Sequence, residues 1–143
     1  MNTKLLKKVQ AAIKAEPKRL NMWMPLTTSG LYDPPACGTV GCIAGWSLVL
    51  DSKIKRSTQD IARVIIRKGD RLDPISNWDK IARNAQSVLG LDTEQANRLF
   101  ILHEWPWALL TQYTDAEGQG DQKKMAGVTC KRINLFIKTR GEE

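Results

Sequence analysis

The stretch CGTVGCIAGW, residues 37–46, holds two cysteines, a threonine and a tryptophan among glycines, and it carries no charged side chain. Thr39 can act as the N-cap of a helix predicted from about Val40 to Leu50, because its hydroxyl can accept a hydrogen bond from the first turn. A loop that enters a helix in this way presents backbone N–H groups, which bind phosphate or carboxylate. The stretch therefore predicts a cradle for an anionic ligand.

The predicted ligand-binding set joins this motif to aromatic and basic side chains from other segments. Residues 21–50 contain a single charged side chain, Asp33, as is typical of the wall of a buried site. Tryptophans would supply apolar contacts and two arginines spaced i, i+4 would supply positive charge. The set comprises Cys37, Gly38, Thr39, Gly41, Cys42, Trp46, Trp23, Arg63 and Arg67.

Cys42 is also a candidate nucleophile, since the free N–H groups and the dipole at a helix N-terminus lower the pKa of a thiol. The general base would be His103, which is the one histidine of the chain. This pair predicts a cysteine-dependent hydrolase, provided that the fold brings the two side chains together.

Two further interpretations of the cysteines remain open. A metal site would use Cys37, Cys42, His103 and Cys130, whose types suit zinc. The first pair is widely spaced and the other two ligands come singly, so no metal is expected. Packing alone is the other interpretation, because small residues let a second backbone approach a helix closely and buried thiols fill small gaps.

A second segment with a candidate chemistry is IARNAQSVLGLDTEQANRLF, residues 81–100. Its two predicted helices and short turn resemble a helix-turn-helix, with polar side chains of the second helix pointing outward. These side chains, some of which are types that read base edges in DNA, are Glu94, Gln95, Asn97 and Arg98. The acidic region 104–117 follows and would repel phosphate, so plain packing of a helical hairpin is favoured.

Apolar residues recur at helical spacing along most of the chain, and no stretch alternates at period two over five or more residues. The N-terminal helix is expected to end at Pro17. Later helices are expected from about Ser57 to Gly69, from Ser76 to Gly90, from Asp92, over 107–113 and from Asp121. The predicted fold is mainly α: one compact domain over residues 1–143 with five to seven helices. The irregular loop at 20–38 has room for a small hairpin.

The net charge of +7 is unevenly distributed over the 143 residues. Residues 1–20 hold six basic and one acidic side chain, whereas residues 91–120 hold one basic and five acidic. A basic excess favours anionic partners such as nucleic acid, nucleotides or acidic proteins. No apolar run is long enough to cross a membrane and no signal-peptide pattern opens the chain. A cytoplasmic location without a membrane partner is therefore expected.

Three stretches together resemble motifs shared by a group of small proteins of bacteria and tailed phages. They are CGTVGCIAGW at 37–46, VLGLDTEQANRLF at 88–100 followed by Trp105-Pro106, and INLFI at 133–137. The group has no settled activity, so the resemblance carries over no catalytic residue. It implies a stand-alone cytoplasmic protein encoded by a phage or prophage.

The sequence thus favours a binding protein over an enzyme. The expected partner is an anionic, nucleotide-like ligand or a host protein held at the 37–46 motif, with nucleic acid as a further candidate partner and with no cofactor. The alternatives are a cysteine-dependent hydrolase that uses Cys42 and His103, and a helix-turn-helix module that binds DNA.

Overall fold

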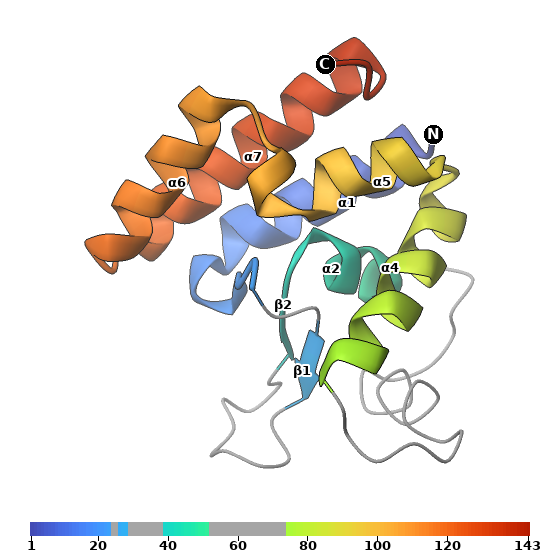
Figure 1. Ribbon diagram of the computed structural model, residues 1–143. Coiled ribbons are helices and arrows are strands. Elements are labelled where there is room, and N and C mark those ends of the chain that lie inside the picture. The colour runs from blue at the N-terminus through green and yellow to red at the C-terminus, as the bar shows by residue number, and fades with distance from the viewer. Residues whose placement is uncertain (24–25, 29–38, 52–73) are drawn as a thin grey trace.

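The computed structural model describes residues 1–23, 26–28, 39–51 and 74–143, and over these ranges six α-helices dominate the chain (Figure 1). This confirms the predicted mainly α fold class. The α-helices are α1 (Thr3–Ala15), α2 (Ile43–Leu50), α4 (Pro74–Leu89), α5 (Thr93–Phe100), α6 (Trp107–Gly118) and α7 (Gln122–Thr139). Two 3-10 helices, η1 (Pro17–Arg19) and η2 (Leu102–Glu104), and two strands, β1 (Leu26–Thr28) and β2 (Thr39–Gly41), complete the described elements.

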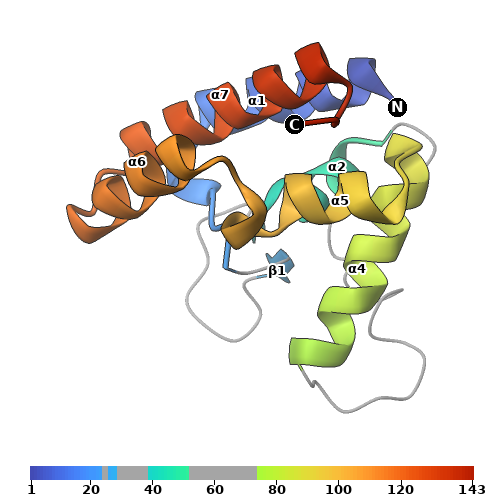
Figure 2. The same ribbon diagram turned by 45° about the horizontal axis from the view of Figure 1, so that its top comes forward.

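Helix α2 packs against α4 and also against α1, and α7 packs along both α1 and α6. Helices α1 and α7 run in opposite directions, so that the two ends of the chain lie at the same end of the molecule (Figure 1 and Figure 2). Strands β1 and β2 form a small antiparallel pair at the edge of this helical arrangement.

Several helix boundaries lie where capping residues predict them. The Asp92 side chain accepts from the backbone N–H of Gln95, and the Gln95 side chain accepts from the N–H of Asp92, which completes a capping box at α5. Asp121 caps α7 by accepting from the N–H of Lys124. Gly90 follows α4 with φ 61, a left-handed conformation that glycine adopts at low cost.

The prediction that Thr39 caps a helix beginning at Val40 is wrong. Residues Thr39–Gly41 form β2, which pairs with β1. Four of the six residues in the two strands are β-branched and therefore favour extended backbone. Helix α2 begins only at Ile43, with Cys42 extended at its N-cap. Strand β1 thus lies inside the expected 20–38 loop, and its partner lies just beyond that loop.

Two other helices differ in length from the prediction. Helix α4 begins at Pro74, before the expected cap at Ser76, because proline is tolerated in the first turn of a helix. Helix α6 continues to Gly118 through residues expected to form a loop, since Ala116 is buried and adds a core contact to its last turns. The helix expected between residues 57 and 69 lies outside the described residues.

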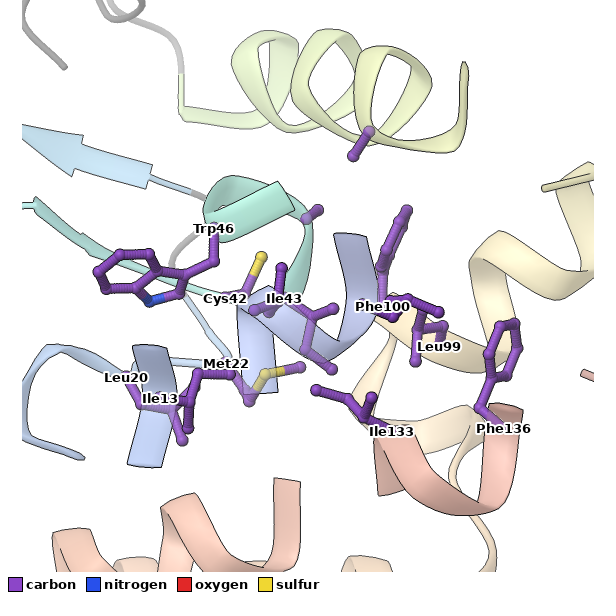
Figure 3. Close-up of a cluster of buried hydrophobic side chains, with 14 of the residues drawn as sticks. Ile13, Leu20, Met22, Cys42, Ile43, Trp46, Leu99, Phe100, Ile133 and Phe136 are labelled. Atoms are coloured by element: carbon purple, nitrogen blue, oxygen red, sulfur yellow. The ribbon is translucent and has the colours of Figure 1, made fainter. Parts of the chain in front are cut away.

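One cluster of buried apolar side chains holds the helices together. It draws on all six α-helices of the described ranges, as Figure 3 shows for a part of it. The fully buried members with 0 % exposure are Leu6, Val9, Ile13, Cys42, Ile43, Ala44, Ala85, Leu89, Leu99, Tyr113, Ile133 and Phe136. Each large apolar side chain in such a cluster contributes about 1.5–3 kcal/mol to the burial free energy.

Candidate functional site

The described part of the 37–46 motif lies in the core. Every residue from Gly41 to Leu48 is buried, and Cys42, Ile43 and Ala44 have 0 % exposure. Figure 3 shows Cys42, Ile43 and Trp46 within the cluster of buried side chains that also contains Ile13, Leu20 and Met22. The first N–H groups of α2 therefore face the interior of the protein, and this burial supports the packing interpretation of the motif.

The two tryptophans of the predicted ligand-binding set lie in different surroundings. Trp46 is 4 % exposed, and the Cζ atom of Arg19 lies 5.0 Å from the centroid of its ring. Trp23 is 54 % exposed, donates from Nε1 to Glu117 at 2.5 Å, and meets the ring of His103 edge-on at 5.7 Å. Four further members of the predicted ligand-binding set lie outside the described residues: Cys37, Gly38, Arg63 and Arg67.

The surroundings of Cys42 disfavour a catalytic role. Burial raises the pKa of its thiol from 9.0 to about 11, although the backbone N–H groups of Gly45 and Ala44 partly lower it. At neutral pH this thiol is protonated, and the protonated form is a poor nucleophile. His103 lies exposed on η2 with its ring against Trp23. The cysteine-dependent hydrolase therefore has no activated thiolate at Cys42.

We expect the stability of the protein to fall in alkali because of Cys42. A thiol pKa raised in the folded state contributes stability that is complete below pH 9.0 and is lost as the pH rises through about 11. Urea unfolding from neutral pH to that value should show a steeper loss for the wild-type chain than for Cys42→Ala. An equal loss in both chains would contradict the burial of this thiol.

The alternative metal set is not brought together. Among the described residues, no three His, Cys, Asp or Glu side chains form a group that could hold a metal ion. Cys130 lies on α7 against α1, where its sulfur is 3.7 Å from the carbonyl oxygen of Gln10. His103 lies on η2, and Cys37 is not among the described residues.

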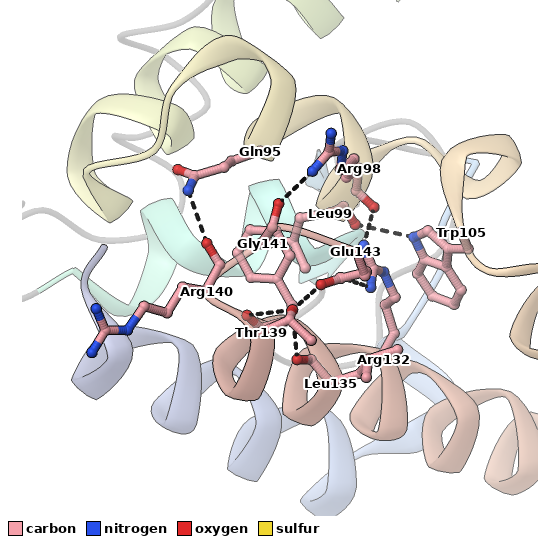
Figure 4. Close-up of polar contacts among 11 residues, drawn as sticks. Gln95, Arg98, Leu99, Trp105, Arg132, Leu135, Thr139, Arg140, Gly141 and Glu143 are labelled. Carbon is pink, nitrogen blue, oxygen red and sulfur yellow. Dashed lines mark hydrogen bonds and ion pairs between the residues drawn. The ribbon is translucent and has the colours of Figure 1, made fainter.

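Helix α5 does not present all four of its predicted DNA-reading side chains. Gln95 and Arg98 donate at 2.9 and 2.7 Å to backbone carbonyls of residues 140–143, which we call the C-terminal turn (Figure 4). Glu94 and Asn97 are exposed, as expected. Because Gln95 and Arg98 hold the C-terminal turn, the expectation that all four point outward is wrong. This arrangement disfavours a helix-turn-helix that reads bases.

A basic surface extends over α1 and α7, neither of which contains an aspartate or a glutamate. Each helix exposes four lysines, and the helices lie side by side. We call this surface the lysine face; its members are Lys4, Lys7, Lys8 and Lys14 on α1, and Lys123, Lys124, Lys131 and Lys138 on α7. These lysines lie near the two ends of the sequence, and only the packing of α1 on α7 brings them together.

An amide bridge connects the two helices within the lysine face. The Gln10 side chain donates from Nε2 to Asn134 Oδ1 at 2.9 Å and to the carbonyl of Cys130 at 3.0 Å. Lysines occur three positions before and four positions after each bridging amide, which places them on nearly the same side of the helix. The four lysines in these positions are Lys7 and Lys14 on α1, and Lys131 and Lys138 on α7.

Few acidic groups neutralise the lysine face. Within the described part of the chain, Lys124 is its one member with an ion pair, to Asp121 at 3.5 Å. Lys131 donates to the neutral amide of Gln112 at 3.0 Å. The positive charge of the face is therefore available to an external anion.

Comparison of the chain with protein-family models, with curated proteins and with solved structures finds no match. None of the helices in the described ranges has the length and apolar character needed to cross a membrane.

Proposed function

We propose that the chain is a non-enzymatic binding protein that holds nucleic acid through the lysine face of α1 and α7. The observation that supports this proposal is that two carboxylate-free helices pack side by side and together expose eight lysines. Lysines that neutralise phosphates release counterions, and this release supplies most of the affinity of sequence-independent binding.

The spacing of the lysines favours a polyanion over a single nucleotide. Lys7 and Lys14 are separated by about 10 Å along the helix axis, at 1.5 Å per residue, and so are Lys131 and Lys138. Small ligands are typically enclosed in concave sites, whereas these lysines are exposed on the outer sides of two helices. A backbone with regularly repeated phosphates can contact several of them at once.

Acidic residues on other elements indicate from which side nucleic acid would approach the protein. Glu94 on α5, Glu104 on η2 and Asp115 on α6 are exposed acidic residues, and they would repel phosphates. Nucleic acid would therefore approach α1 and α7 rather than α5 and α6. The proposal retains a phage- or prophage-encoded protein of the bacterial cytoplasm, and it moves the contact surface away from the 37–46 motif, whose residues 41–46 are buried.

Binding of a labelled DNA duplex, measured by fluorescence anisotropy between about 50 and 200 mM salt, tests the proposal. The double variant Lys7→Gln/Lys138→Gln should bind roughly tenfold more weakly, with a salt slope reduced by about 2. The charge-matched control is Lys18→Gln/Arg83→Gln, which alters exposed residues on η1 and α4. This control should bind nearly as the wild type does.

Equal weakening by both double variants would show that only net charge matters and would overturn the assignment of the lysine face. An affinity that does not depend on salt would overturn binding through phosphates altogether. Saturable binding of a mononucleotide that exceeds the affinity for the duplex would point instead to the small anionic ligand expected from the sequence.

A further inference from the structure

A buried arginine lies on the side of α7 that faces α5. Arg132 has 0 % exposure, and among the described residues it is the one fully buried side chain that carries a charge. Its Nη1 group pairs with the carboxylate of Glu143, and its Nη2 group donates to the carbonyl oxygen of Arg98 at 2.8 Å. Because an unpaired buried charge is very costly, Glu143 supplies the neutralising anion that this position requires.

The carboxylate of Glu143 is held by a second group. Its other oxygen lies within hydrogen-bond distance of the Thr139 hydroxyl, which also lies 3.0 Å from the carbonyl oxygen of Leu135 (Figure 4). A hydroxyl can rotate between two acceptors, so the Thr139 proton can serve either of them. Arg132 and Thr139 together bind an anionic group that the C-terminal turn brings back onto α7.

Solvent reaches the Glu143 side chain but not that of Arg132. The Glu143 side chain is 14 % exposed while that of Arg132 is not exposed at all, so the carboxylate lies between the guanidinium and water. The buried Nε of Arg132 has no hydrogen-bond partner among the described groups. This donor shares an edge of the guanidinium with Nη2, whereas the anion is held through Nη1 and the Thr139 hydroxyl.

We propose that Arg132 and Thr139 form a binding site for a small oxyanion, of the class of a phosphate group, which Glu143 occupies in the present conformation. Arginine recognises carboxylate and phosphate with the same geometry of donors, so one can replace the other. Glu143 is tethered close to the site and therefore competes at high effective concentration. Free anion binds well only when the C-terminal turn is displaced or its carboxylate is removed. This site is separate from the lysine face and does not depend on the function proposed for that face.

Thermal unfolding of the Glu143→Ala variant in inorganic phosphate, with ionic strength held constant by chloride, tests this site. Phosphate should raise the midpoint of unfolding saturably, with an apparent Kd at least tenfold lower than that of the wild-type chain. The neighbouring Glu142→Ala variant should respond as the wild type does. Arg132→Met/Glu143→Ala should not respond to phosphate, since methionine fills the space of the aliphatic part of Arg132 but lacks the guanidinium.

Equal stabilisation of the wild type and Glu143→Ala by phosphate would overturn the proposal, as would a response that survives in Arg132→Met/Glu143→Ala. If Glu143→Ala is unfolded without phosphate, its refolding on addition of phosphate but not of chloride supports the site, and failure to refold contradicts it. In the folded wild type, nuclear magnetic resonance should show a saturable shift of the Arg132 Nε–H resonance as phosphate is raised to a high concentration. The absence of any shift counts against the site.

Discussion

Replacing Glu143 with alanine is expected to lower the free energy of unfolding by about 3–5 kcal/mol, because it leaves the buried Arg132 without its counter-charge. Burial lowers the pKa of the Arg132 guanidinium in spite of the neighbouring carboxylate, which indicates how poorly solvated this position is. Urea unfolding followed by circular dichroism, in chloride buffer without phosphate, measures the change.

Two matched variants separate charge from packing in this experiment. Glu142→Ala removes an exposed carboxylate of the same turn and should change stability by less than about 0.5 kcal/mol. Arg132→Met/Glu143→Ala removes both charges and should recover much of the loss, since a buried ion pair can often be replaced by an apolar side chain. A double variant no more stable than Glu143→Ala would contradict the explanation by uncompensated charge.

The second large effect is expected for Gly141→Ala, at about 2–4 kcal/mol of destabilisation. Gly141 has φ 78, and a Cβ atom added there would lie 2.8 Å from the ring of Phe136 and 3.0 Å from Cγ of Gln95. Phe136 is fully buried, so its ring has little freedom to move away. Chemical unfolding of the variant gives the loss directly, and thermal unfolding should show a lower midpoint.

The control for this prediction is Gly127→Ala, in the interior of α7. A Cβ atom there meets nothing within 4 Å, and alanine favours a helix over glycine by about 0.5–1 kcal/mol. Gly127→Ala should therefore stabilise the protein. A wild-type-like stability for Gly141→Ala would mean that the C-terminal turn does not lie against α5, and it would remove the basis of the anion site as well.

The signals that predicted structure correctly are local ones. The capping box of Asp92 and Gln95, the N-cap at Asp121 and the left-handed Gly90 each act through groups a few residues apart. The apolar stripes of α1 and α7 identify their buried sides for the same reason, because helical spacing alone places these residues together.

The 37–46 motif was misjudged because two local preferences compete there. Thr39 is a good N-cap residue, but it is also β-branched and has a strand partner in β1, which lies more than ten residues earlier in the chain. Pairing with β1 and burial of Cys42 and Ile43 shift the start of the helix to Ile43. Neither contact can be inferred from the motif itself.

The helical class, the caps of α5 and α7 and the apolar sides of the helices follow from the sequence alone, since these depend on interactions within a few residues. The sequence does not reveal that α1 and α7 lie side by side with their lysines, that Arg132 is buried, or that α5 holds the C-terminal turn. The Arg132–Glu143 pair connects α7 to the turn that follows it, and the lysine face combines residues from the two ends of the sequence. Such contacts depend on how helices pack, and packing is set by the whole core rather than by the pattern of any one segment.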